Sequence, residues 1–134
     1  MFIDLSSFDS FIDIINNETH TEYWETSAYI KSIFKKYLKS PNKDFSKQSI
    51  TLIWQKAKEV ANFETFQDIG DWTFFTRTMF PESISCSPEL YDTFGQTSYY
   101  RCYRYLNGQW PLYEELADKF KIFVENIQEN LNSI

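Results

Sequence analysis

The stretch Gly70–Ser83 reads GDWTFFTRTMFPES. It places an acidic residue, an arginine and five large apolar side chains within a few helical turns, with glycine at its start and proline near its end. Pro81 stops a helix, because its ring clashes with the preceding turn and it has no N–H to donate. We therefore expect a helix from about residue 64 to about residue 80.

Apolar residues recur at helical spacing on both sides of this stretch. Ser87-Pro88-Glu89 is a start signal, with a capping serine, proline at the first helical position and an acid in the first turn. Asn107-Gly108 closes the same helix, because both residues tolerate a left-handed backbone. The cleanest periodicity begins after Pro111 and runs to Leu131, which predicts one unbroken terminal helix. The other expected helices span about 8–15, 19–39 and 46–61.

These segments predict an all-α fold. The chain has 134 residues, which fits one domain covering residues 1–134. It contains only 3 Gly and 4 Pro, so there is little of the turn chemistry that a strand-rich fold needs. We expect a compact antiparallel bundle of about five to six helices.

The helix that starts at Pro88 has small residues at the centre of its apolar stripe. Gly95, Ser98 and Cys102 occupy these positions. Small side chains allow a neighbouring helix to approach closely, so a larger residue there should overpack the contact. We therefore expect a tight helix pair along this stripe.

The charge and the cysteine content limit the classes of partner and compartment. The formal net charge is −6, which disfavours nucleic acid as a partner, because nucleic-acid binders usually carry a basic surface. The chain has only 2 Cys and no positively charged leader followed by an apolar segment. No apolar run approaches the roughly 18 residues of a membrane span. These features predict a soluble cytoplasmic protein that contacts neither membrane nor nucleic acid.

Three motifs in the second half of the chain follow one another in a fixed order. They are Gly70-Asp71-Trp72 leading to Phe80-Pro81-Glu82, then Tyr91-x-x-x-Gly95-x-x-Ser98-Tyr99, then Leu116-x-x-x-Phe120. In these motifs residues 68–134 resemble a family of small, uncharacterised bacterial helical proteins. The resemblance implies an all-helical fold in a bacterial cytoplasm. It implies no activity.

Asp71 and Arg77 are the charged residues inside the opening stretch. Asp71 has two interpretations: an N-cap or a carboxylate bonded to backbone N–H groups, or a buried carboxylate of raised pKa that faces a cleft. Arg77 lies six residues further on. It is no helical partner of Asp71, and we expect a structural ion pair with Glu82 or another helix rather than an anion site.

The run Tyr99-Tyr100-Arg101-Cys102-Tyr103-Arg104-Tyr105 alternates aromatic and basic side chains. Helical spacing turns Cys102 and Tyr105 inward, and it turns four residues more outward: Tyr100, Arg101, Tyr103 and Arg104. Tyrosine and arginine are enriched at the energetic centres of protein interfaces. The run therefore predicts either a partner surface or ordinary surface packing.

Catalytic and metal-binding patterns are scarce. His20 is the only histidine, which is too few for a histidine-based metal site or a di-iron site of Glu-x-x-His pairs. Three isolated glycines form no phosphate-binding loop. Glu114 and Glu115 open the terminal helix, where they suit the helix dipole. We expect no catalytic residues, no metal and no cofactor.

The sequence thus predicts a non-enzymatic helical interaction module: a regulator, inhibitor or accessory subunit of a bacterial cytoplasmic system. It would dock a protein partner through the Tyr/Arg face or through its acidic surface, and complementary charge would select a basic partner for the latter. A homo-oligomer is a further possibility. The alternative is a small-molecule-binding protein or enzyme with an interhelical pocket. That pocket would be lined by Asp71, Trp72, Arg77, Tyr91 and Tyr99.

Overall fold

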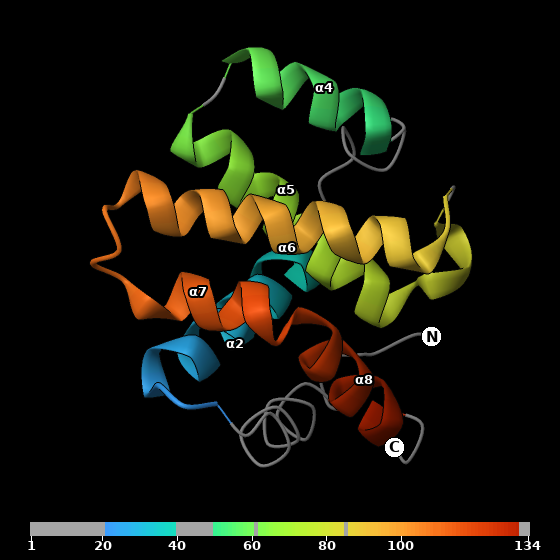
Figure 1. Cartoon of the computed structure of the whole chain (residues 1–134). Coiled ribbons are helices and arrows are strands. Elements are labelled where there is room, and N and C mark those ends of the chain that lie inside the picture. Colours follow the sequence, from blue (N-terminus) through green and yellow to red (C-terminus); the bar gives the residue numbers. More distant parts are fainter. Residues whose placement is uncertain (1–20, 40–49, 61, 85, 132–134) are drawn as a thin grey trace.

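The computed structural model describes residues 21–39, 50–60, 62–84 and 86–131, and all of its regular elements are helices (Figure 1). The expected helix near residues 8–15, the capping position Ser46 and His20 lie outside the described residues. The all-α prediction is confirmed. The elements are α2 (Trp24–Lys39), α4 (Ile50–Val60), α5 (Phe63–Met79), the 3₁₀ turn η1 (Pro81–Ser83), α6 (Pro88–Tyr105), α7 (Pro111–Asp118) and α8 (Phe120–Leu131).

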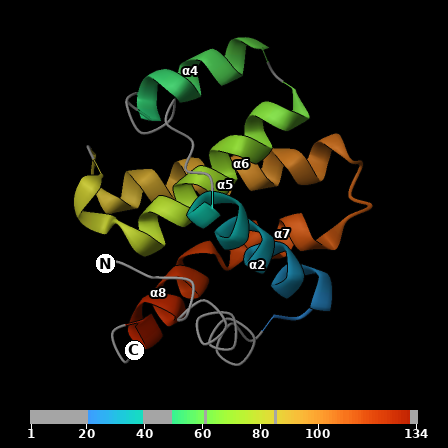
Figure 2. The ribbon, with the colours of Figure 1, turned by 180° about the vertical axis from the view of Figure 1, so that it is seen from behind.

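Helices α5 and α6 form the centre of the bundle. They run side by side in opposite directions, and α7 returns along α6 after a short turn (Figure 1). On the other side, seen in Figure 2, α2 packs against α5 and α7. Helix α8 contacts α5 and α6, whereas α4 packs against α5. Each of the long central helices is therefore covered on several faces.

The helix ends follow the capping signals in the sequence. The side chain of Ser87 accepts a hydrogen bond from the Leu90 N–H at 3.2 Å, and Pro88 is the first residue of α6. Helix α5 ends at Met79, before Pro81. The α6–α7 turn uses a left-handed backbone at Asn107 (φ 54°) and Gly108 (φ 71°). Asn62 was not anticipated as a cap: its side chain accepts from the Thr65 N–H at 2.7 Å.

The prediction of one unbroken terminal helix is wrong. The chain bends at Lys119, whose backbone angles (φ −108°, ψ 15°) separate α7 from α8. Hydrogen bonds continue through the bend, because the Lys119 N–H still donates to the Glu115 carbonyl and the Phe123 N–H to the Lys119 carbonyl. The bend leaves Phe120 fully buried, with its ring 5.3 Å from that of Phe74. The packing of Phe120 in the core thus interrupts the helix, although the apolar spacing continues from Pro111 to Leu131.

The tight pairing of α6 with its neighbours is confirmed. A Cβ atom at Gly95 would lie 2.4 Å from the Phe120 ring and 2.7 Å from the Thr73 hydroxyl oxygen. A Cβ atom at Gly70 of α5 would lie 2.8 Å from the Tyr99 ring. Such separations are far below van der Waals contact. The two glycines therefore let aromatic rings come close to the helix backbone: Tyr99 of α6 at α5, and Phe120 of α8 at α6.

Candidate functional site

Asp71 lies in the middle of α5, where its carboxylate is buried among tyrosines from other helices. The Tyr99 hydroxyl of α6 donates to one carboxylate oxygen at 2.8 Å. The Tyr29 hydroxyl of α2 donates to the same oxygen at 2.8 Å and lies 3.1 Å from the other. The prediction of an N-cap or backbone-bonded carboxylate is wrong, because these partners are side chains from distant parts of the chain.

A third tyrosine completes this group, which we call the Asp71 cluster (Asp71, Tyr29, Tyr99, Tyr113 and Gln67). Tyr113 of α7 packs edge-on against Tyr29, with ring centroids 5.5 Å apart. The Gln67 side-chain amide donates to the Tyr113 hydroxyl at 2.9 Å. The cluster therefore joins α2, α5, α6 and α7 through polar contacts, which are strong when desolvated and fully partnered.

Burial raises the pKa of Asp71 to about 7, although the hydrogen bonds from Tyr99 and Tyr29 act in the opposite direction. Burial likewise raises the pKa of the Tyr99 hydroxyl, and the adjacent Asp71 charge adds to that effect. The raised pKa expected for a buried Asp71 is present. The expected cleft is not, since the side chain lies in closed packing with 6% of its surface exposed.

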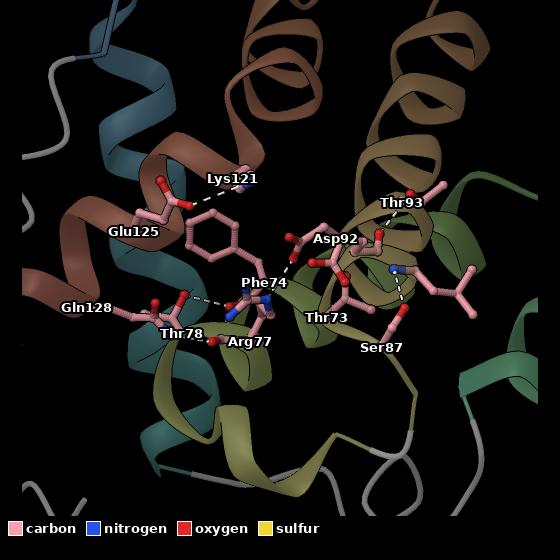
Figure 3. A network of polar contacts seen from close by, with 12 residues as sticks. Thr73, Phe74, Arg77, Thr78, Ser87, Asp92, Thr93, Lys121, Glu125 and Gln128 are labelled. Carbon is pink, nitrogen blue, oxygen red and sulfur yellow. Dashed lines mark hydrogen bonds and ion pairs between the residues drawn. The ribbon is translucent and has the colours of Figure 1, made fainter.

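Arg77 forms the structural ion pair that the sequence predicted, with a partner on another helix. Its Nε donates to a carboxylate oxygen of Asp92 in α6 at 2.9 Å, and both side chains are largely buried (Figure 3). The Gln128 side chain of α8 donates to the Arg77 carbonyl at 2.8 Å. Arg77 thus holds α5, α6 and α8 together, and among the described residues it shares no partner with Asp71.

The remaining residues of the predicted interhelical pocket are also packed. Tyr91 and Tyr99 are buried in the core. Trp72 is half-buried against Tyr37, with ring centroids 5.3 Å apart. None of the surface depressions described below is lined by these residues. The structure distributes the predicted pocket residues over two closed clusters and the hydrophobic core.

The Tyr/Arg face predicted on α6 lies at the surface and is hollowed. We define the α6 groove as the depression lined by Thr97, Tyr100, Arg101, Arg104 and Tyr105. It is shallow and open. Tyr100 and Tyr105 are 46% and 44% exposed, respectively. Tyr105 was expected to point inward, and that prediction is wrong: it stays at the surface, where its ring packs 6.2 Å from that of Phe66.

Arg101 is held in the groove wall by aromatic rings. Its guanidinium lies 5.1 Å from the Phe66 ring centroid and 5.7 Å from that of Trp54. Such cation–π contacts stabilise an exposed arginine by about 0.5–1 kcal/mol each. The side chain is exposed yet oriented, so it would lose little conformational entropy when a partner binds.

Glu115 lies in α7, on the helix that the sequence predicted, and has partners that the sequence did not predict. Its carboxylate accepts hydrogen bonds from the backbone N–H groups of Glu22 and Tyr23, just before α2. The Lys119 ammonium adds an ion pair at 3.0 Å. Burial alone would raise the pKa of Glu115, but these hydrogen bonds hold it below its ordinary value. No local pattern signals such a cap, because the two partners lie far apart in sequence.

The described residues offer neither a metal site nor a membrane-spanning helix. In the described part of the chain, no group of histidine, cysteine and acidic side chains is arranged to hold a metal ion. Within residues 21–39, 50–60, 62–84 and 86–131, none of the helices combines the length and apolar character needed to cross a bilayer. No family model, curated protein or solved structure matches the chain.

Proposed function

We propose that this protein is a non-enzymatic helical interaction module that docks an acidic segment of a protein partner on the α6 groove. It would act as a regulator, inhibitor or accessory subunit in a bacterial cytoplasm. The observation that carries the proposal is the combination of two exposed tyrosines and two arginines in one groove, with Arg101 oriented by aromatic rings. Tyrosine and arginine supply much of the binding energy at protein interfaces.

Charge complementarity selects the acidic partner. Arg101 and Arg104 lie one helical turn apart in the groove lining, and none of the lining residues that the structure describes is acidic. The two arginines make the groove positive, although the whole chain has a net charge of −6. Complementary charge would attract an acidic segment to the groove and favour one docking geometry. The two guanidinium groups suit carboxylates, which they bind in a bidentate geometry.

The alternative of a small-molecule site or enzyme around Asp71 and Arg77 has less support. Both side chains already have partners in closed packing, and a substrate would have to break the Asp92 ion pair or the tyrosine hydrogen bonds. Removing one partner of a buried charge is strongly unfavourable. We therefore assign these two residues to stability rather than to recognition.

Capture experiments with matched variants test the proposal. The test variant combines Tyr100→Ala with Arg104→Glu and leaves Arg101 in its aromatic contacts. The control combines Leu90→Ala with Lys35→Glu, which truncates one exposed apolar side chain and reverses one positive charge outside the groove. Both variants are first checked for wild-type helicity and melting temperature.

The expected result is one protein that is retained from host extract by the wild type and the control but lost with the test variant. Raising the salt concentration should weaken its retention, because the contacts are charged and partly exposed. Equal retention by both variants would remove the α6 groove as the docking surface. Retention of nothing beyond background would overturn the interaction-module proposal itself.

A further inference from the structure

A second depression lies at the opposite end of the α6–α7 turn from the α6 groove. Its lining comes from two places in the chain: the start of α2 and the turn before α7, which lie side by side in Figures 1 and 2. We call it the Trp110 pocket, and it is lined by Tyr23, Glu25, Gln109, Trp110, Pro111 and Leu112. Two aromatic side chains are exposed there, Trp110 at 52% and Tyr23 at 37%.

The size of the Trp110 pocket suits one side chain. Its volume is about 230 Å³. This is below the roughly 300–1,000 Å³ typical of sites for drug-sized ligands and cofactors. The pocket is also less open than the α6 groove. A single long side chain from a partner would fill it, whereas a nucleotide or a large cofactor would not fit.

The chemistry of the walls selects a cation. Two aromatic rings, from Tyr23 and Trp110, line the pocket together with the Glu25 carboxylate. In the described part of the chain, Glu25 has neither an ion-pair nor a hydrogen-bond partner. Aromatic faces attract cations, most strongly when the ring is tryptophan. None of the described lining residues is a lysine or an arginine.

Nearby charges make the surroundings negative. The pKa of the Tyr23 hydroxyl is raised, first by the charge of Glu22, then by burial and then by Glu115 and Glu114. The N-terminal ends of α2 and α7 also face this region, and each carries about half a positive charge. Glu115 already accepts hydrogen bonds from the backbone N–H groups of Glu22 and Tyr23. The carboxylates of Glu22, Glu25 and Glu114 therefore outweigh the two helix ends.

We propose that the Trp110 pocket binds an arginine side chain from a basic segment of a partner protein. The guanidinium would stack on the indole of Trp110, and its N–H groups would donate to the Glu25 carboxylate. Arginine suits this arrangement better than lysine, because its planar group stacks on aromatic rings and donates in a fork that matches a carboxylate. This surface is separate from the α6 groove and carries the opposite charge, so it does not depend on the proposed docking of an acidic segment.

The test is a titration of the ¹⁵N-labelled protein with the peptide acetyl-Gly-Arg-Gly-amide, followed through the indole N–H signal of Trp110. The same peptide with citrulline replaces the guanidinium by a neutral group of the same shape. We expect saturable shifts of the Trp110 signal with the arginine peptide and at least tenfold weaker binding of the citrulline peptide. Glu25→Gln should weaken binding of the arginine peptide by a similar factor. Trp24→Ala, at a residue that is 76% exposed and outside the pocket, should leave it unchanged.

Three results would overturn the proposal. If the Trp110 signal does not move, the pocket binds no guanidinium. If citrulline and arginine peptides bind equally, charge is not recognised. If free arginine binds more tightly than the capped peptide, the ligand is a free amino acid and not a protein segment.

Discussion

The Asp71 cluster predicts an unusual dependence of stability on pH. The folded protein holds the pKa of this carboxyl at about 7, mainly through burial, whereas an aspartate in an unfolded chain has a pKa near 3.9. Between these values the folded state keeps a proton that the unfolded state has lost. The free energy of unfolding should therefore fall as pH rises through this window, and it should level off above pH 7.

The magnitude follows from the same two pKa values. One pKa unit corresponds to about 1.4 kcal/mol, so the full contribution of Asp71 is about 4 kcal/mol. About 2–3 kcal/mol of it falls between about pH 5 and about pH 8, a window in which most other carboxylates stay ionised. A change of this size is a large part of the 5–15 kcal/mol that typically stabilises a domain.

Asp71→Asn isolates the effect, because an amide keeps the shape and still accepts the hydroxyl hydrogen bonds but does not ionise in this range. Urea unfolding of both proteins at pH 5, 6, 7 and 8 gives the measurement. Titrations shared by the two proteins cancel in the difference. The stability of the variant relative to the wild type should rise by about 2–3 kcal/mol from pH 5 to pH 8.

Glu129→Gln is the control, because Glu129 is exposed on α8. The stability of the Glu129→Gln variant relative to the wild type should not change over this pH range. Parallel pH curves for the wild type and Asp71→Asn would refute the reasoning, since they would show that the carboxyl titrates alike in the folded and unfolded chains.

Two further predictions concern packing and capping. Gly95→Leu should destabilise by about 1–3 kcal/mol or more, because its side chain would collide with Phe120, whereas Gln109→Leu at an exposed turn position should have little effect in thermal unfolding. Equal melting temperatures for these two variants would contradict the close helix approach. Glu115→Gln should cost about 0.5–2 kcal/mol and speed hydrogen exchange in the first turn of α2, while the exposed neighbour Glu114→Gln should do neither. Unchanged exchange in α2 would show that Glu115 is not its cap.

Local patterns were sufficient to predict most helix boundaries in the described chain. The Ser87-Pro88 start, the Pro81 stop and the left-handed Asn107-Gly108 turn depend on backbone chemistry within a few residues, so the sequence shows them directly. The stripe of small residues on α6 (Gly95, Ser98 and Cys102) was also predicted, because helical spacing alone places these residues on one face.

Contacts between distant residues were not predictable in the same way. Asp71 receives its hydrogen bonds from α2 and α6, and Glu115 caps a helix that begins more than 90 residues earlier. The bend at Lys119 accompanies the packing of Phe120 against Phe74 in the core. The spacing of apolar residues in α7 and α8 carries no information about that contact. For the same reason, the sequence grouped Asp71 with Arg77, whereas the fold gives them separate partners.

The outward face of α6 was predicted in part. Helical spacing placed Tyr100, Arg101 and Arg104 at the surface, and they do line the groove. The same spacing turned Tyr105 inward, but the ring packs over Phe66 at the edge of the bundle and stays exposed. The stacking of Arg101 on Trp54 and Phe66 needed the fold, because these rings come from α4 and α5.

Photo-crosslinking in the native host tests the docking role of the α6 groove most directly. A photo-reactive phenylalanine analogue is placed at Tyr100, inside the groove, and in a matched protein at Leu90, which is exposed near the start of the same helix. If the groove is the docking surface, the analogue at Tyr100 crosslinks one dominant partner protein through an acidic segment of that partner. The analogue at Leu90 crosslinks none. Equal crosslinking from both positions, or none from Tyr100, would contradict the docking role of the α6 groove.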